Sequence, residues 1–210
     1  MRRAGAGRAG VKGAAPRAWQ RMLSGRRLDL LDPSPLDIEI EDIAHGLARV
    51  ARWNGQTSGP HIFSVAQHSL LVEALALAAE PLLTPVMRLT VLLHDAPEYV
   101  VGDIISPFKG FLGPGYKDVE NRILAAVHLR FSLPPAPAPA LAKLTKQADR
   151  AAAFIEATRL AGFSPAEAER LFGRPAAGMR AADGLLKPLS SDEAEERFMA
   201  RFTSIDKETR

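Results

Sequence analysis

The chain has 210 residues, of which 47% are hydrophobic and 24% are charged, a composition that suits one domain with a sizeable core. The absence of cysteine excludes a disulfide framework, a zinc ribbon and a thiol nucleophile. The net charge of +3 is unevenly distributed, because residues 1–27 hold eight basic side chains and no acid while residues 28–210 are acidic overall. We therefore expect a basic, disordered tail over 1–27 and a single domain over 28–210.

No apolar run approaches the ~18 residues of a membrane-spanning helix. The basic tail also lacks the apolar core of a secretory signal, so we expect a cytoplasmic protein with no membrane partner. A tail of this charge can contact nucleic acid, but a solvated extension is favoured because the domain behind it is acidic.

Apolar residues recur at helical spacing along most of the domain. The pattern predicts helices over 41–53, 64–79, 86–95, 116–131 and 141–162, with later helices that begin near Ser164 and Ser190. Two N-termini have typical caps: Ser64 with Gln67 forms a capping box, and Thr84 precedes Pro85. Extended pieces fit only 27–31 and 36–40. The predicted fold class is therefore all-α, a single compact helical bundle.

The segment 86–95 is apolar nearly all round, so we expect a helix at the centre of the domain, kinked or restarted by Pro97. It ends in His94 and Asp95. A buried aspartate is unfavourable unless it is paired or coordinated, so this pair is a candidate metal site. The structural alternative is that Asp95 caps the restarted helix and His94 donates to a backbone carbonyl.

Two further acids follow closely in the chain. Glu98 lies four residues after His94, on the same helix face, and Asp103 comes after Gly102. No Lys or Arg follows until Lys109. Concentrated carboxylates repel one another unless a cation lies nearby, and a divalent metal ion would serve.

Two more candidates come from other predicted helices. His68 lies on an apolar stripe, where the alternative is a core histidine with its hydrogen bonds satisfied. Asp149 lies beside an apolar stripe, where the alternative is a surface aspartate paired with Lys146 or Arg150.

Taken together, His68, His94, Asp95 and Asp149 offer two imidazoles and two carboxylates. This mixed set suits one divalent ion such as Co, Mn, Zn, Fe or Ni. Open coordination positions on such an ion would hold water and substrate, and the ion would polarise a phosphoryl oxygen. The remaining histidines receive no role in the site: His45, His61 and His128.

The order of these residues resembles the HD-domain metal-dependent phosphohydrolase superfamily, and in particular its bacterial 5'-deoxynucleotidase-like branch. The resembling stretches are Arg52-Trp53, Val65-Ala66-Gln67-His68-Ser69-Leu70, His94-Asp95-Ala96-Pro97-Glu98, Gly102-Asp103-Ile104-Ile105-Ser106-Pro107, Tyr116-Lys117 with Glu120, and Lys146-Gln147-Ala148-Asp149. Residues 28–53 together with Gln67-His68-Ser69 also resemble small phage-type deoxynucleoside triphosphate triphosphohydrolases.

The resemblance implies an HD-domain helical bundle with a metal site in its core. It also implies the site roles. The metal ligands would be His68, His94, Asp95 and Asp149, of which Asp95 and Asp149 would also contact the substrate. Glu98 would be the general acid/base, and Asp103 would support catalysis or hold the sugar. The other substrate-binding residues would be Arg52 for the phosphate, Trp53 against the nucleoside, and Ile104, Ile105 and Ser106 on the sugar side.

The implied reaction is hydrolysis of a 5'-deoxyribonucleoside monophosphate to the deoxyribonucleoside and phosphate. Two alternatives stay open: a deoxynucleoside triphosphate triphosphohydrolase, and a non-catalytic nucleotide or metal sensor. A third, a nucleic-acid-binding protein that uses the basic tail, is disfavoured by the acidic domain. We expect a small-molecule nucleotide as partner rather than nucleic acid, and a homo-oligomer that is a dimer or larger.

Overall fold

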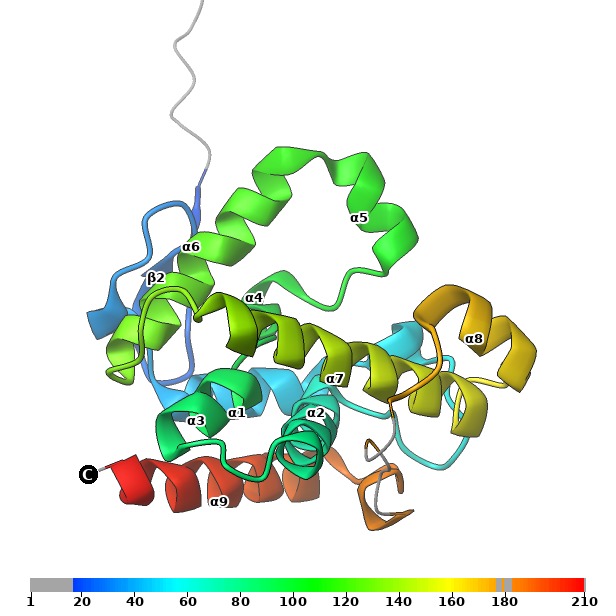
Figure 1. Ribbon diagram of the computed structural model, residues 1–210. Coiled ribbons are helices and arrows are strands. Elements are labelled where there is room, and N and C mark those ends of the chain that lie inside the picture. The colour runs from blue at the N-terminus through cyan, green and yellow to red at the C-terminus, as the bar shows by residue number, and fades with distance from the viewer. Residues whose placement is uncertain (1–16, 177–178, 180–182, 210) are drawn as a thin grey trace, which may run out of the picture.

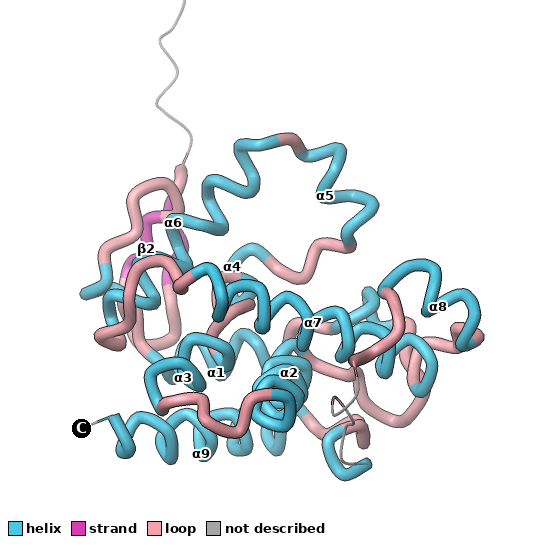
Figure 2. The backbone as a smooth tube through the Cα atoms, viewed as in Figure 1, coloured by secondary structure: helices cyan, strands magenta, loops and turns pink. Residues whose placement is uncertain are grey.

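The computed structural model describes residues 17–176, 179 and 183–209, without the side chains of residues 106, 107 and 183. The described part is helical apart from one two-stranded hairpin, which confirms the all-α prediction (Figure 2). The elements are β1 (Trp19–Arg21), β2 (Arg27–Asp29), η1 (Pro35–Asp37), α1 (Ile40–Arg49), η2 (Arg52–Gly55), α2 (Val65–Ala79), α3 (Pro85–Leu92), α4 (Glu98–Val101), α5 (Ser106–Leu112), α6 (Pro114–Arg130), α7 (Pro139–Arg159), α8 (Pro165–Phe172), η3 (Asp183–Leu185) and α9 (Ser191–Thr209).

The hairpin corrects the expectation of a disordered tail. Residues 1–16 lie outside the described residues, but the prediction is wrong for residues 17–27, where β1 pairs antiparallel with β2. Three arginines lie over the Trp19 ring, with guanidinium carbons 4.4–5.8 Å from its centroid. The turn is fixed by Ser24, whose backbone N–H and hydroxyl both donate to Asp42 of α1. Packing and hydrogen bonds therefore order a segment whose composition alone predicts disorder.

The predicted helix starts are confirmed by their caps. The hydroxyl of Ser64 accepts from the Gln67 N–H, and that of Thr84 accepts from the Met87 N–H. The Gln67 side chain does not complete the expected capping box. Its amide instead donates to the Lys187 carbonyl and accepts from the Leu189 N–H, which ties α2 to the segment before α9.

The central helix is shorter and less enclosed than the sequence predicts. The second half of α3 is fully buried, but Val86 and Met87 in its first turn are each 38% exposed. The helix ends at Leu92, and the chain restarts as α4 directly after Pro97, as expected for a proline that cannot continue a helix. The turn between α3 and α4 carries His94 and Asp95.

Helix α2 is the centre of the arrangement. It is seen nearly end-on in Figure 1, with α7 crossing above it and α9 running along the lower side. It contacts α1, α3, α7 and α9, and its two sides join two clusters of buried apolar side chains. Its residues therefore meet those of α3 and α7 in the interior. None of the helices in the described part is both long and apolar enough to span a membrane.

A close contact between α1 and α4 fixes the position of α4, the short helix that begins at Glu98. A Cβ on Gly46 of α1 would lie 2.8 Å from the Cβ and 2.9 Å from the carbonyl oxygen of Tyr99. We predict that Gly46→Ala lowers the free energy of unfolding by about 1–3 kcal/mol, the usual effect of overpacking, although alanine is the better helix former. Urea unfolding measures this. The control is Gly115→Ala, because a Cβ on Gly115 of α6 meets nothing within 4 Å. An equal loss in both variants would contradict the prediction.

Candidate metal centre

The structure brings the four predicted ligands together from two helices and one turn. His68 comes from α2, Asp149 from α7, and His94 and Asp95 from the turn after α3. Ligand atoms of His68, His94 and Asp149 lie within 4.8 Å of one another, a group that could hold a metal ion. The Oδ2 atom of Asp95 lies 3.4 Å from Nε2 of His68 and 3.2 Å from Nε2 of His94.

Both imidazoles turn their Nε2 atom toward this group. Nδ1 of His68 lies 2.6 Å from a carboxylate oxygen of Glu156, and Nδ1 of His94 lies 2.9 Å from the carbonyl oxygen of Val91. Because both partners are acceptors, each Nδ1 carries a proton, and each Nε2 is the ring nitrogen turned toward the aspartates. Both Nε2 atoms are buried without a hydrogen-bond partner among the described residues. Metal-ligating histidines have this arrangement, with the outer N–H fixed by a carboxylate or a carbonyl.

The two aspartates are held as carboxylates. Burial works against their charge, but the neighbouring imidazoles hold the pKa of Asp95 and of Asp149 well below the usual range. Asp149 uses its two oxygens differently: Oδ1 lies 3.5 Å from Nε2 of His68, and Oδ2 accepts from Lys146 at 2.8 Å. Asp149 therefore faces the predicted ligand group with one oxygen and makes the alternative surface pair with Lys146 through the other.

Glu156 is the functional residue that the sequence reasoning missed. It is fully buried on α7 and accepts from His68 with one oxygen, and from Trp53 at 2.9 Å and Arg52 at 3.2 Å with the other. Burial opposes its charge, but Arg52 and His68 keep its pKa below the usual value. Glu156 lies seven residues after Asp149 on the same face of a predicted helix, and this spacing is the sequence signal that could have identified it.

Arg52 and Trp53 lie beside the centre in η2, tied to acids and to aromatic rings. Arg52 donates to Oδ2 of Asp103 at 3.0 Å as well as to Glu156. The ring of Trp53 packs against two phenylalanines at 5.5 and 5.7 Å, Phe163 and Phe172. Its φ of 57° is left-handed, an unfavourable conformation for a bulky side chain. In the structure Arg52 and Trp53 therefore hold acids beside the centre by hydrogen bonds. Their expected contacts with the substrate stay predictions.

Glu98 lies near the centre as a buried acid. One of its oxygens lies 3.6 Å from Nζ of Lys109, which itself donates to Glu120 at 3.1 Å. Burial raises the pKa of Glu98 to about 9, aided by the charges of Asp95 and Asp103 and opposed by Arg52 and Lys109. Glu98 is therefore protonated at neutral pH in the metal-free protein, as a general acid requires.

A cavity of about 230 Å³ opens beside the ligand group. Its lining is Thr90, His94, Asp95, Leu124, His128, Pro137, Ala142, Thr145, Lys146 and Asp149. Two of the residues that the resemblance places on the sugar side do not line it: Ile104 is half-buried and Ile105 is 41% exposed. The side chain of the third, Ser106, lies outside the described residues.

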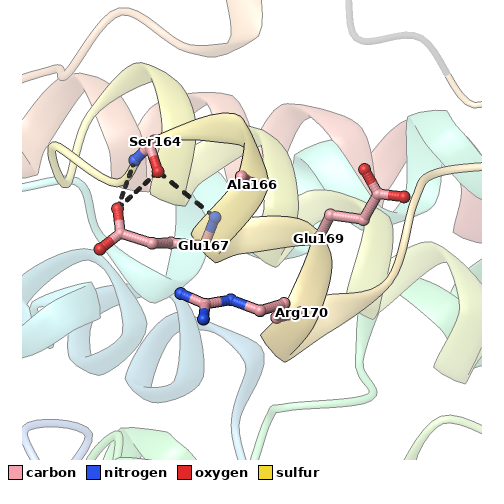
Figure 3. A pocket seen from close by; sticks show the side chains of 5 residues that line it. All are labelled: Ser164, Ala166, Glu167, Glu169 and Arg170. Carbon is pink, nitrogen blue, oxygen red and sulfur yellow. Dashed lines mark hydrogen bonds between the residues drawn. The ribbon is translucent and has the colours of Figure 1, made fainter.

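A larger hollow lies at the start of α8 and shares no lining residue with the ligand group (Figure 3). Two of its lining residues bond each other: Glu167 accepts from the backbone N–H and hydroxyl of Ser164, and the Ser164 hydroxyl accepts from the Glu167 N–H. The carboxylate of Glu169 accepts from Arg174. The bonds between Ser164 and Glu167 are the capping box of α8, so these polar atoms leave no group that points to a ligand.

Comparison with known proteins places the chain in a family. It is 62% identical over 160 residues to an uncharacterized protein of Rhodobacter capsulatus, covering 76% of this chain and 81% of that protein, and it belongs to the same family. It is also 37% identical over 99 residues to the uncharacterized protein YfdR of Escherichia coli, covering 47% of this chain and 50% of that protein. No protein-family model matches the chain.

We predict that alanine in place of His68, His94, Asp95 or Asp149 abolishes binding of a divalent ion, because each replacement removes one donor from a four-donor set. Elemental analysis of the purified variants measures this. His61→Ala is the matched control, since His61 is an exposed histidine outside the group. Unchanged metal content in the Asp149 variant would remove that residue from the site.

The raised pKa of Glu98 predicts a stability effect with a definite sign. From its ordinary pKa of 4.5 up to about 9, the folded chain keeps a proton that the unfolded chain releases, so the free energy of unfolding falls as pH rises. Glu98→Gln removes this penalty. In chelator-treated protein it is expected to raise the melting temperature more at pH 8 than at pH 5, by about 2–4 °C for each 1 kcal/mol.

The control for this comparison is Glu196→Gln, which neutralises an exposed carboxylate on α9. It is expected to leave the melting temperature nearly unchanged at both pH values. The same shift for Glu98→Gln at pH 5 and pH 8 would show that Glu98 does not carry the extra proton.

Proposed function

We propose that this chain is an HD-domain metal-dependent phosphohydrolase that acts on nucleotides. The preferred substrate is a 5'-deoxyribonucleoside monophosphate. The observation that carries the proposal is a pair of buried Nε2 atoms, on His68 and His94, that make no hydrogen bond within the described part of the chain. They lie 3.2–3.5 Å from carboxylate oxygens of Asp95 and Asp149. The resemblance described from the sequence supports the nucleotide substrate. The proposal includes the expected cytoplasmic location and homo-oligomer.

The donor set fits a divalent ion such as Co, Mn, Zn, Fe or Ni, which would supply a water of lowered pKa and a Lewis acid for a phosphoryl oxygen. The protein's part is to orient its ligands and to move protons. Glu156 fixes His68 by holding its Nδ1–H. In this proposal Glu98 gives its proton to the 5'-oxygen of the leaving nucleoside as the bond from that oxygen to phosphorus breaks.

The charges around the centre favour a monophosphate over a triphosphate. A triphosphate needs several free cations, and the sequence offers Arg49, Arg52, Lys109 and Lys117. Three of these already pair with acids, and a monophosphate requires only Arg52 to turn from its acids to the phosphate. Arg49 bonds Asp192 and Glu195, Arg52 bonds Asp103 and Glu156, and Lys109 bonds Glu120.

A phosphate-release screen over nucleoside mono-, di- and triphosphates, each with several divalent ions, tests the function. The expected result is release of phosphate from deoxynucleoside monophosphates that a chelator abolishes. Glu98→Gln is expected to keep the metal and to lower turnover by about 10²–10⁴-fold, the usual size of proton-transfer catalysis. Arg52→Lys keeps the charge but loses the planar fork, so KM should rise.

The other outcomes separate the alternatives. Release of triphosphate from deoxynucleoside triphosphates, with monophosphates untouched, would favour the triphosphohydrolase. A metal-loaded protein that binds nucleotides and hydrolyses none would be a sensor. Wild-type turnover in metal-loaded Glu98→Gln would remove the acid/base role from Glu98.

A further inference from the structure

Apart from His94, Asp95 and Asp149, the residues that line the cavity beside the ligand group have no role in the proposed function. The cavity lies among side chains of α3, α6 and α7 and reaches His94, Asp95 and Asp149. Neither Arg52 nor Lys109 lines it. Its volume of about 230 Å³ is below that of a typical drug-sized pocket, so it suits part of a nucleotide rather than the whole.

His128 is the unexplained polar group of this cavity. It is 1% exposed, and its Nδ1–H donates to the carbonyl oxygen of Pro134 at 3.0 Å. Its Nε2 is buried without a partner among the described residues. Burial lowers the pKa of His128 against the effect of this carbonyl, so the ring is neutral and Nε2 is an acceptor. A buried acceptor without a partner is unfavourable unless something else supplies a donor.

The other uncharged polar groups of the lining are also acceptors. The hydroxyls of Thr90 and Thr145 donate to the carbonyls of Val86 and Leu141, each at 2.9 Å. Their hydrogens are used, and their oxygen lone pairs remain. The only Lys or Arg among the described lining residues is Lys146, which is largely exposed and bonded to Asp149. Such a lining matches a neutral group with hydroxyl donors and not a second phosphate.

We infer that this cavity binds the sugar of the leaving nucleoside, and that Nε2 of His128 accepts a hydrogen bond from a sugar hydroxyl. The inference rests on the proposed function and deepens it, because it names the residue that selects a hydroxyl-bearing leaving group. It also gives the sugar a binding site other than residues 104–106, which the resemblance implies. The phosphate would lie at the ligand group, where the cavity ends.

A substrate comparison tests this hydrogen bond. Wild-type protein loaded with Mn²⁺ should hydrolyse a deoxynucleoside 5'-monophosphate with a kcat/KM about 2- to 13-fold above that of the 2',3'-dideoxy analogue, the effect of one neutral hydrogen bond. In His128→Leu this preference should vanish while metal content stays unchanged. The control is His61→Leu, which replaces an exposed histidine and should keep the preference.

A second variant covers the case in which His128→Leu does not fold. Ala142 lines the cavity from an exposed position on α7, so Ala142→Leu should fill space there without disturbing the core. It should raise KM for the nucleotide, whereas Lys143→Leu on the neighbouring exposed position should not. Neither change should alter KM for methyl phosphate, which has no sugar.

The outcomes distinguish this inference from the proposed function. Hydrolysis of both nucleotides at equal kcat/KM by wild-type protein, or an unchanged preference in folded His128→Leu, would overturn the sugar-binding site and leave the phosphohydrolase standing. An unchanged nucleotide KM in Ala142→Leu would do the same. No phosphate release from any ester would overturn the proposed function and the sugar-binding site with it.

Discussion

The hydrogen bond between the buried His68 and the buried Glu156 is the constraint on which the rest of the centre depends. Glu156 has no solvent contact, so its charge is tolerable only because His68, Trp53 and Arg52 all donate to it. Loss of one partner of such a buried charge typically costs about 3–5 kcal/mol. The same bond sets the ring of His68 so that Nε2 faces Asp95 and Asp149. The Glu156 carboxylate therefore stabilises the junction of α2, α7 and η2, and it also orients His68 toward the two aspartates.

The centre contains several unfavourable features that share one explanation. Two imidazole nitrogens have no hydrogen-bond partner within the described residues, Glu98 is buried as an acid, and Trp53 has a left-handed backbone. Each feature is unfavourable by itself, and such features collect at functional sites when the surrounding structure enforces them. Here the enforcing structure is the pair of apolar clusters on either side of α2. A divalent ion would relieve the first of these by accepting both lone pairs.

Much of this arrangement could be predicted from the chain, because it depends on local rules. Helical periodicity and caps gave the helices, and His68 on an apolar stripe pointed into the interior. Glu156 was missed because its partners lie about 90 to 100 residues away in the sequence, and no local pattern reports such a contact. The order of residues 17–27 was missed because composition does not report the bonds from Ser24 to Asp42. The role of His128 depends on a cavity among three helices, which only the folded chain defines.

The central claim is that His68, His94, Asp95 and Asp149 hold one divalent ion. Anomalous diffraction from crystals grown with Mn²⁺ or Co²⁺ tests it most directly, because it locates the ion independently of any activity. The account predicts one strong peak about 2.0–2.3 Å from Nε2 of both histidines and from an oxygen of each aspartate. Ordered crystals with no peak at this group, or with the peak elsewhere in the chain, would contradict it.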